Sequence, residues 1–287
     1  MKDAWRPLYP FESQWMYLPT SHRLHYLDSG EGEPIVALHG NPTWSFYYRE
    51  LVKEFEKTNR VIVPDHIGCG LSDKPQDYPY TLKQHIDNLE AFVNKLELEP
   101  FNLVVHDWGG AIGFGYAVRH PEMVKRILVM NTAAYRHNKM PAVLKLARSP
   151  FIGELLIRGL NAFAFGSALT SVHRPLSAYA ISGYLYPYDS WRNRIAIYRF
   201  VKDIPMKPED PSYETLKSIE EGLPSLAEKP MSFVWGAKDF VFDDRFFNRW
   251  KTIYPNAEFT RITDAGHYVM EDASVRVFRK LHALLEK

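Results

Sequence analysis

The chain has 287 residues, with 35 Lys and Arg against 34 Asp and Glu, so its formal net charge at pH 7 is only +1. This length suffices for one large domain or for a core with an insertion, and the balanced charge gives no reason to expect a nucleic-acid partner. The single cysteine, Cys69, excludes an internal disulfide, and the N-terminal residues lack the long apolar segment of a secretory signal. We therefore expect a cytoplasmic protein, and no cluster of metal ligands indicates a metal or other cofactor.

Short apolar strands alternate with helical patterns over most of the chain, which predicts an α/β fold with a mostly parallel sheet flanked by helices. The eight expected strands cover residues 16–18, 24–27, 35–38, 61–63, 103–105, 127–130, 232–235 and 259–262. The main helical patterns cover residues 45–56, 82–96, 111–119, 243–254 and 272–285. The first two strands are joined by a short link, which predicts an antiparallel hairpin at one edge of the sheet.

The alternation stops between residues 132 and 223, where helix-like patches separated by prolines replace the strands. We predict a helical cap domain over residues 133–222, inserted into a core domain made of residues 1–132 and 223–287. The longest apolar stretch, residues 151–169, is interrupted by polar residues, so it suits an amphipathic helix packed against the core better than a transmembrane segment. The aromatic residues of the cap are expected to pack against the core or to line an apolar pocket; they include Phe151, Phe163, Phe165, Tyr179 and Trp191.

Residues 101–113, FNLVVHDWGGAIG, combine a buried apolar strand with an abrupt turn and small residues that start a helix. This layout resembles the nucleophile elbow of α/β hydrolases, usually G-x-S-x-G, with Asp107 in the place of serine and Val105 in the place of the first glycine. A carboxylate at this point is suited to displacing a leaving group from saturated carbon through an alkyl ester. Asp107 is therefore the candidate nucleophile.

Two more reactive residues follow later strands, in the order nucleophile, acid, histidine that α/β hydrolases use. Asp239 comes after strand 232–235 and His267 after strand 259–262. A histidine held by an acid can deprotonate water. The alternative acid position, after strand 127–130, holds Asn131, which lacks the negative charge that an imidazolium needs. We therefore predict that Asp239 is the acid partner of His267.

Other polar residues near these positions have structural explanations. Asp243 and Asp244 stand where a helix begins, so N-capping accounts for them. Asp264 is too close in sequence to His267 to be chosen as its partner. His39 and His106 lack the support that His267 has, and we interpret them as turn and packing residues.

Five segments carry a family resemblance over nearly the whole chain: HGNPTWS at 39–45, PDHIGCGLSDKP at 64–75, VVHDWGG at 104–110, WGAKDFVF at 235–242 and DAGHYVMED at 264–272. Together they resemble the haloalkane dehalogenases of the α/β-hydrolase superfamily, in the subfamily (type III) with an Asp-His-Asp triad and an Asn–Trp pair for halide. That pair corresponds here to Asn41 and Trp108. The same subfamily contains the β-lactone decarboxylases of long-chain olefin synthesis, to which YPFES at 9–13, HGNPTWSFYYREL at 39–51 and NRIAIYRFVKDIP at 193–205 are similar.

The resemblance implies a haloalkane dehalogenase that forms an alkyl ester on Asp107 while Asn41 and Trp108 hold the departing halide and, through their backbone N–H groups, the later oxyanion. His267 then activates the water that releases an alcohol. The alternative is a cis-β-lactone decarboxylase that uses the same aspartate, with the ring carboxylate as leaving group.

Two further classes are weaker candidates. An epoxide hydrolase would use cap tyrosines, of which the chain has several, but the position of Asn41 is usually aromatic in that group. A non-catalytic protein of this fold would be expected to lack a member of the triad, and all three are present. The expected partner is a small apolar substrate, and a homo-oligomer or a complex with olefin-pathway enzymes is left open.

Overall fold

The structure is a computed structural model that describes residues 4–287. Eight strands form one sheet in the order β1-β2-β4-β3-β5-β6-β7-β8. The strands are β1 (Gln14–Tyr17), β2 (Arg23–Ser29), β3 (Pro34–Leu38), β4 (Arg60–Pro64), β5 (Phe101–His106), β6 (Val124–Met130), β7 (Met231–Gly236) and β8 (Glu258–Ile262). β2 pairs antiparallel with both β1 and β4, and the other neighbours are parallel. The predicted mostly parallel sheet and its edge hairpin are confirmed.

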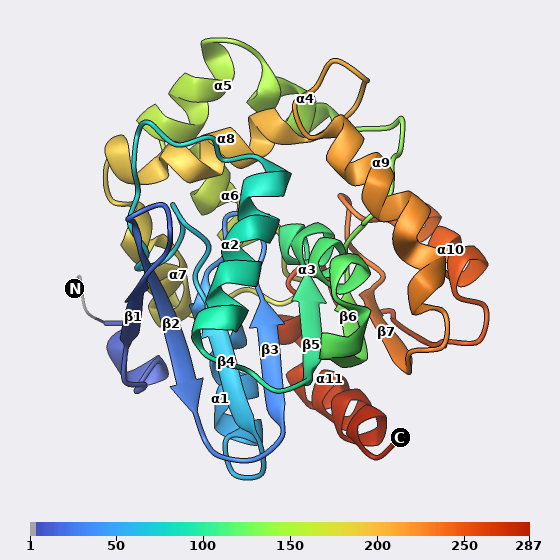
Figure 1. Ribbon diagram of the computed structural model, residues 1–287. Coiled ribbons are helices and arrows are strands. Elements are labelled where there is room, and N and C mark those ends of the chain that lie inside the picture. Colours follow the sequence, from blue (N-terminus) through green and yellow to red (C-terminus); the bar gives the residue numbers. More distant parts are fainter. Residues whose placement is uncertain (1–3) are drawn as a thin grey trace.

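Helices cover both faces of the sheet (Figure 1). The core helices are α1 (Arg49–Phe55), α2 (Leu82–Lys95), α3 (Trp108–Arg119), α10 (Asp244–Ile253) and α11 (Val269–Leu285). One cluster of buried side chains packs α2, α3 and α10 on one face, and a second packs α1 and α11 on the other. β5 lies between these clusters and is buried along its whole length, with Val105 in the first cluster and Val104 in the second. This two-sided burial explains why its sequence is apolar without alternation.

The chain between β6 and β7 is helical, and no strand occurs there in the described structure. Its helices are α4 (Ala142–Arg148), α5 (Ile152–Glu154), a π-helical turn (Leu155–Gly159), α6 (Ala162–Thr170), α7 (Ala178–Leu185), α8 (Ile195–Asp203) and α9 (Tyr213–Gly222). α4, α5, α6 and α8 lie beyond the carboxyl ends of the parallel strands, whereas α9 packs against α3 (Figure 1). The insertion therefore covers the end of the sheet at which ligands bind in open α/β folds.

The expected burial of the cap aromatics is wrong for most of those named. Phe163 is partly buried and packs against a small cluster within the insertion. The side chains of the other four are exposed, by 86% for Phe151, 49% for Phe165, 60% for Tyr179 and 45% for Trp191. The cluster is built mainly from small and aliphatic residues of short helices, so these large rings remain on the outside.

The apolar stretch of the insertion does not form one long helix. Within residues 4–287 no individual helix has both the length and the apolar character to cross a membrane; only Ile152–Gly159 and Ala162–Thr170 taken together, with a 72° bend between them, meet that test.

Candidate active site

Asp107 occupies a strained turn between β5 and α3. Its φ of 51° and ψ of −127° are rarely adopted by residues other than glycine. A side chain at position 109 would collide with the carbonyl of Leu38, and one at position 110 would collide with Thr132, so only glycine fits at either place. The Asp107 carbonyl accepts hydrogen bonds from Gly110 N at 2.9 Å and from Thr132 Oγ1 at 2.5 Å. These contacts hold the turn and project the Asp107 side chain beyond the end of the sheet.

The two oxygens of the Asp107 carboxylate have different neighbours. Oδ1 accepts a hydrogen bond from the backbone N–H of Asn41 at 2.7 Å. Oδ2 lies 3.6 Å from Nε2 of His267. Burial raises the pKa of Asp107 above its ordinary value, and it outweighs the opposing effects of His267 and the backbone N–H groups of Asn41 and Trp108. Because Oδ1 is held by the backbone, Oδ2 is the oxygen available to attack a substrate.

His267 is held by Asp239, as the sequence predicts. Its Nδ1 donates to Asp239 Oδ2 at 2.7 Å, which leaves Nε2 facing Asp107. Burial favours the neutral imidazole, but the carboxylates of Asp239 and Asp107 together outweigh this effect and raise the pKa of His267 above 6.5. The imidazolium is therefore stabilised between two carboxylates.

Asn131 contributes to the site in a way that the sequence analysis missed. Its side-chain N–H donates to Asp239 Oδ2 at 2.9 Å, and its Oδ1 accepts from the backbone N–H of Gly236 at 2.8 Å. Two more backbone N–H groups, those of Val241 and Phe242, donate to Asp239 Oδ1 at 2.7 and 3.0 Å. The asparagine at the alternative acid position thus orients Asp239, the carboxylate that contacts His267. Asp264 lies apart from this group and pairs with Arg276.

His106 forms a hydrogen bond with the backbone of His267 in addition to its packing contacts. Its Nε2 donates to the backbone carbonyl of His267 at 2.9 Å, and the two rings lie 4.5 Å apart, with Tyr47 stacked on His106. Burial and the neighbouring His267 hold the pKa of His106 well below its ordinary value, so it stays neutral. The interpretation of His106 as a packing residue is therefore incomplete, because it also fixes the position of the His267 backbone.

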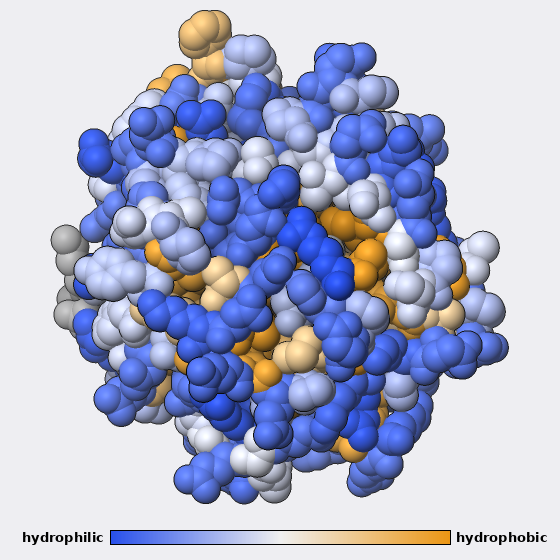
Figure 2. All heavy atoms as spheres, viewed as in Figure 1, coloured by the Kyte–Doolittle hydropathy of each residue, from blue (hydrophilic) through white to orange (hydrophobic). Residues whose placement is uncertain are grey.

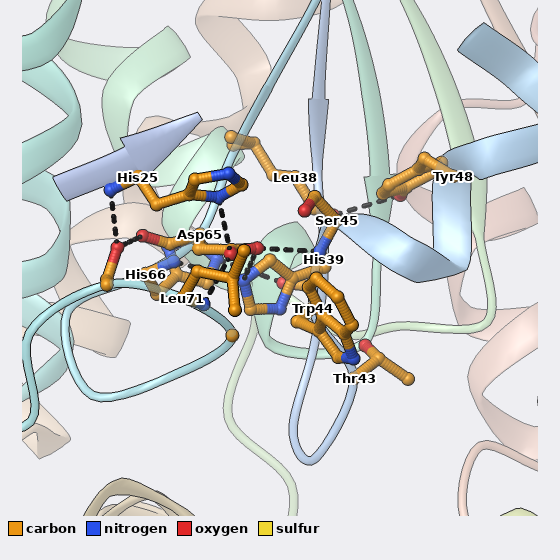
Figure 3. Close-up of polar contacts among 12 residues, drawn as sticks. His25, Leu38, His39, Thr43, Trp44, Ser45, Tyr48, Asp65, His66 and Leu71 are labelled. Atoms are coloured by element: carbon orange, nitrogen blue, oxygen red, sulfur yellow. Dashed lines mark hydrogen bonds and ion pairs between the residues drawn. The ribbon is translucent and has the colours of Figure 1, made fainter. Parts of the chain in front are cut away.

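A buried polar network centred on Asp65 holds the turn that carries Asn41 (Figure 3). Asp65 accepts hydrogen bonds from Ser45 N at 2.7 Å, from His25 Nδ1 at 2.8 Å and from Leu71 N at 2.8 Å. Within the turn, His39 donates from Nδ1 to the carbonyl of Gly40 at 2.7 Å and accepts at Nε2 from His66 N at 3.0 Å. His39 is therefore a turn residue, as predicted, whereas the roles of His25 and Asp65 were missed.

Asn41 and Trp108 present N–H groups to the same space. Asn41 Nδ2 donates to the carbonyl of Ile197 in α8 at 3.3 Å, and its second hydrogen is left for a ligand. The indole N–H of Trp108 has no acceptor within the part of the chain that the structure describes. Both donors are uncharged, so they can stabilise a departing anion without holding it as tightly as a cation would.

These groups line a cavity of about 320 Å³ between the sheet and the insertion. Asn41, Asp107, Trp108 and His267 line it, and Asp239 lies behind His267. The remaining wall is largely apolar and includes Met140, Leu144, Phe163, Val201, Leu216 and Phe246. A cavity of this kind suits an apolar substrate with one reactive polar centre.

The cavity wall disfavours epoxide hydrolysis. Tyr135 and Tyr268 are its tyrosines, and the Tyr135 hydroxyl donates to the carbonyl of Phe246. The five cap tyrosines considered for epoxide activation are outside the described lining: Tyr179, Tyr184, Tyr186, Tyr188 and Tyr198. Within residues 4–287 no group of three or more His, Cys, Asp or Glu side chains is placed to hold a metal ion.

Comparisons with known proteins agree with this geometry. A family model described as alpha/beta hydrolase fold matches residues 33–167. The cis-3-alkyl-4-alkyloxetan-2-one decarboxylase of Shewanella oneidensis is 47% identical over 94% of this chain and 87% of its own length. Haloalkane dehalogenase 2 of Mycobacterium bovis is 30% identical over 94% and 93% of the two chains. The chain belongs to the haloalkane dehalogenase-like α/β hydrolases.

The fold of this dehalogenase-like hydrolase has close counterparts among solved structures. A putative ancestral haloalkane dehalogenase, AncHLD2, superposes with a TM-score of 0.88 at 26% identity and covers 95% of this chain and 98% of its own. The sequence resemblance to haloalkane dehalogenases and their decarboxylase relatives is therefore confirmed. Four of the five predicted site residues of this hydrolase line one cavity, and Asp239 contacts the fourth of them, His267, from behind.

The histidine loop of this hydrolase is tied to the insertion through Asp272. The Asp272 carboxylate accepts from Gly266 N at 2.7 Å, and from His173 N and Arg174 N at 2.7 and 3.0 Å. Asp272 directly precedes the kink in α11, where Ala273 has non-helical dihedral angles. One buried side chain therefore satisfies three backbone donors from two separate segments.

We expect Asp272→Ala to lower the free energy of unfolding by about 3 kcal/mol or more, because it leaves three backbone N–H groups without their charged acceptor. Urea denaturation followed by circular dichroism measures the change. Asp264→Ala is the matched control: its salt bridge with Arg276 is solvent-exposed, so its loss should cost less than about 1 kcal/mol. Equal losses in the two variants would contradict this role of Asp272.

Proposed function

We propose that this protein decarboxylates cis-3,4-dialkyl-β-lactones (oxetan-2-ones) to alkenes and carbon dioxide. The observation that carries the proposal is the higher identity to a β-lactone decarboxylase, 47% against 30% for a haloalkane dehalogenase over the same share of the chain. An apolar cavity with a single reactive carboxylate accommodates a substrate that has two alkyl groups. Of the two activities that the sequence suggests, the alternative is thus better supported than haloalkane hydrolysis.

The first step is attack by Asp107 Oδ2 on C4, the saturated ring carbon that bears the ring oxygen. A bond forms between Oδ2 and C4 with inversion, and the C4–O bond breaks, so the ring opens to an ester on Asp107 with a free carboxylate on C3. Relief of ring strain assists this displacement. The Asn41 side-chain amide and the Trp108 indole N–H donate to the carboxylate as its charge develops.

The second step regenerates the aspartate without water. The bond between C3 and the carboxylate carbon breaks to release carbon dioxide, its electron pair forms the C3=C4 double bond, and the C4–Oδ2 bond breaks. Inversion in the first step followed by anti departure in the second leaves both alkyl groups on the same side. A cis lactone therefore gives a cis alkene.

His267 acts differently in the two candidate reactions. In decarboxylation, its imidazolium, held between Asp239 and Asp107, stabilises the Asp107 carboxylate as that group leaves C4. In haloalkane hydrolysis, neutral His267 takes a proton from the water that attacks the ester. Asp239 supports both roles because it fixes the tautomer and stabilises the imidazolium.

These roles predict opposite responses to pH near the pKa of His267, which Asp239 and Asp107 raise above its ordinary value. Below that pKa the ring is charged, which favours decarboxylation, and above it the ring is neutral, which favours ester hydrolysis. As the pH rises through this range, we expect alkene formation to slow and alcohol formation from a haloalkane to accelerate. Rates of both reactions measured on one preparation over a pH series test this. Parallel pH profiles would contradict the two assigned roles.

Haloalkane hydrolysis is the second candidate activity. Two uncharged N–H donors beside a nucleophilic carboxylate suit halide as well as carboxylate as the leaving group. Terminal bromoalkanes and iodoalkanes should therefore react more slowly than the lactone but faster than chloroalkanes, because chloride is the poorest leaving group of the three.

The protein is divided into a core domain and a cap domain in this proposal. We infer that residues 133–222 act as a cap domain on a core of residues 1–132 and 223–287, since helices of this segment lie beyond the carboxyl ends of the strands. The lone cysteine supports a cytoplasmic location. Two forms of assembly stay predictions: a homo-oligomer and a complex with olefin-pathway enzymes. Light scattering of the purified protein tests for the homo-oligomer.

The proposed function is tested by offering the enzyme a cis-β-lactone, a terminal bromoalkane and a terminal epoxide separately at equal concentration. We expect the lactone to be consumed fastest, with alkene as the product and little halide release from the bromoalkane. Halide release with an inert lactone would establish a dehalogenase instead. Diol from the epoxide, with neither other activity, would overturn both assignments.

A further inference from the structure

The insertion carries a large apolar surface on its outer side, opposite the sheet. This outer cap face is formed by α4, α5, the π-helical turn and α6, which contact one another in sequence. Its exposed members are Val143, Leu146, Phe151, Ile152, Leu155, Leu160, Phe165 and Leu169, each with at least 49% of its side chain accessible. Apolar side chains project from the molecule above α5 in Figure 2. Exposed apolar side chains gathered on adjoining helices mark a surface that binds something.

The insertion as a whole carries a positive charge. Residues 133–222 contain twelve Lys and Arg and eight Asp and Glu, a formal charge of +4, so the remainder of the chain carries −3 to give the net +1. Lys139, Lys145 and Arg199 are exposed, and their side chains have no ion-pair partner among residues 4–287. The near-neutral net charge of the protein is thus the sum of a positive insertion and a negative remainder.

A cleft beside the outer cap face gathers three cations. Lys145 and Arg148 from α4 and Lys202 from α8 line it, together with Met140 and Met206. Arg148 donates a hydrogen bond to the carboxylate of Asp210, and Lys202 donates to the backbone carbonyl of Arg148. Lys145 remains free to contact an anion.

We propose that the outer cap face docks on an anionic lipid surface. Phe151 and Leu160, exposed by 86% and 67%, enter the boundary between headgroups and acyl chains, while Lys145 and its neighbours contact lipid phosphates. Apolar area and electrostatic attraction to anionic lipid are the two terms that hold a peripheral protein on a membrane. A second copy of this chain fits the face poorly, because symmetric pairing would bring two insertions of formal charge +4 together.

The docked face lies beside the entrance to the active-site cavity. Val143, Ala162 and Thr170 are exposed residues of α4 and α6 that also line the cavity. If the substrate is a dialkyl-β-lactone, as the proposed function holds, it dissolves in lipid and reaches Asp107 from the membrane without crossing water. Lipid docking itself does not depend on which reaction Asp107 performs.

The test is sedimentation of the full chain with vesicles of phosphatidylcholine, with and without phosphatidylglycerol. We expect binding to the anionic vesicles that weakens with added salt and nearly disappears on phosphatidylcholine alone. Phe151→Asp/Leu160→Asp should weaken binding by more than about tenfold, since both apolar contacts are lost and two anions are added. Val275→Asp is the control: Val275 is exposed by 68% on α11, away from the outer cap face, so this variant should bind like the wild type.

Activity separates this proposal from the proposed function. Neither Phe151 nor Leu160 lines the cavity, so the double variant should keep its rate on a short-chain substrate dissolved in water and lose rate only on vesicle-borne substrate. No sedimentation with anionic vesicles, or unchanged binding in the double variant, would overturn lipid docking whatever the activity. A dimer or a protein complex that the double variant breaks, with no vesicle binding, would assign the face to protein contacts and overturn it equally.

Discussion

Asp107→Ala is expected to abolish turnover of a cis-β-lactone and of a bromoalkane alike, with a loss of at least about 10⁴-fold for each. Both reactions begin with displacement at saturated carbon by Asp107 Oδ2, and no second carboxylate lines the cavity within the described chain. Gas chromatography of alkene and measurement of released halide follow the two activities. The variant should stay folded, since the turn is held through the backbone carbonyl of residue 107, which alanine keeps.

Asp264→Ala is the control for this experiment, because Asp264 is a carboxylate near His267 in sequence that pairs with Arg276 away from the cavity. It should keep the wild-type rates. Loss of only one activity in Asp107→Ala would show that the two reactions use different nucleophiles. Near wild-type activity on both substrates would remove Asp107 from the mechanism.

His267→Phe is expected to separate the two reactions. With a bromoalkane, displacement needs no proton transfer, so halide should be released once per enzyme and the alkyl ester on Asp107 should persist. Intact-protein mass spectrometry should then show one added alkyl group. The ester accumulates because no group remains to activate water within reach of it.

With a cis-β-lactone the same variant should continue to turn over, slowed by about a hundredfold through loss of the imidazolium beside the leaving carboxylate. No water is consumed in that reaction, so no ester should accumulate to full occupancy. His267→Gln, which keeps a polar side chain without a charge, should behave like His267→Phe with both substrates. A trapped lactone adduct without alkene would mean that His267 is required to complete decarboxylation.

The strands and the order of the reactive residues could be predicted from the sequence for one physical reason. A strand that is buried on both faces has an unbroken run of apolar residues in its sequence. Polar residues that follow such strands lie at the carboxyl end of a parallel sheet. Asp107 directly follows such a run, and Asp239 lies in the loop after another. The strand before His267, β8, is only partly buried, so the order nucleophile, acid, histidine was the stronger signal for that residue. Asn41 and Trp108 were assigned by resemblance, and the structure brings both to the same cavity.

The supporting contacts had no such local signal. Asn131 meets Asp239 across 108 positions of sequence, and His106 meets the backbone of His267 across 161. Asp65 and Asp272 act mainly on backbone N–H groups, whose positions depend on the finished fold. Side chain–backbone bonds of this kind leave no periodicity in the sequence.

For the insertion, the apolar residues themselves can be recognised in the sequence. What the sequence does not show is whether their side chains face the core or the solvent. Residues 151–169 read as a stretch that packs on the core, whereas short helices and a π-helical turn leave Phe151 and Leu160 outside. Hydrophobicity alone does not say whether a short apolar helix covers a core or faces outward. The basic residues just before this stretch, Lys145 and Arg148, are the feature that could have indicated an outer surface.

The geometry of the alkene formed from a pure cis-β-lactone tests the central claim most directly, because it reports both steps at Asp107. Inversion at C4 followed by anti loss of carbon dioxide and aspartate predicts cis alkene, one molecule for each lactone consumed, measured by gas chromatography against both isomers. Trans alkene would contradict the ester intermediate on Asp107, and a β-hydroxy acid in place of alkene would show that the protein hydrolyses the lactone.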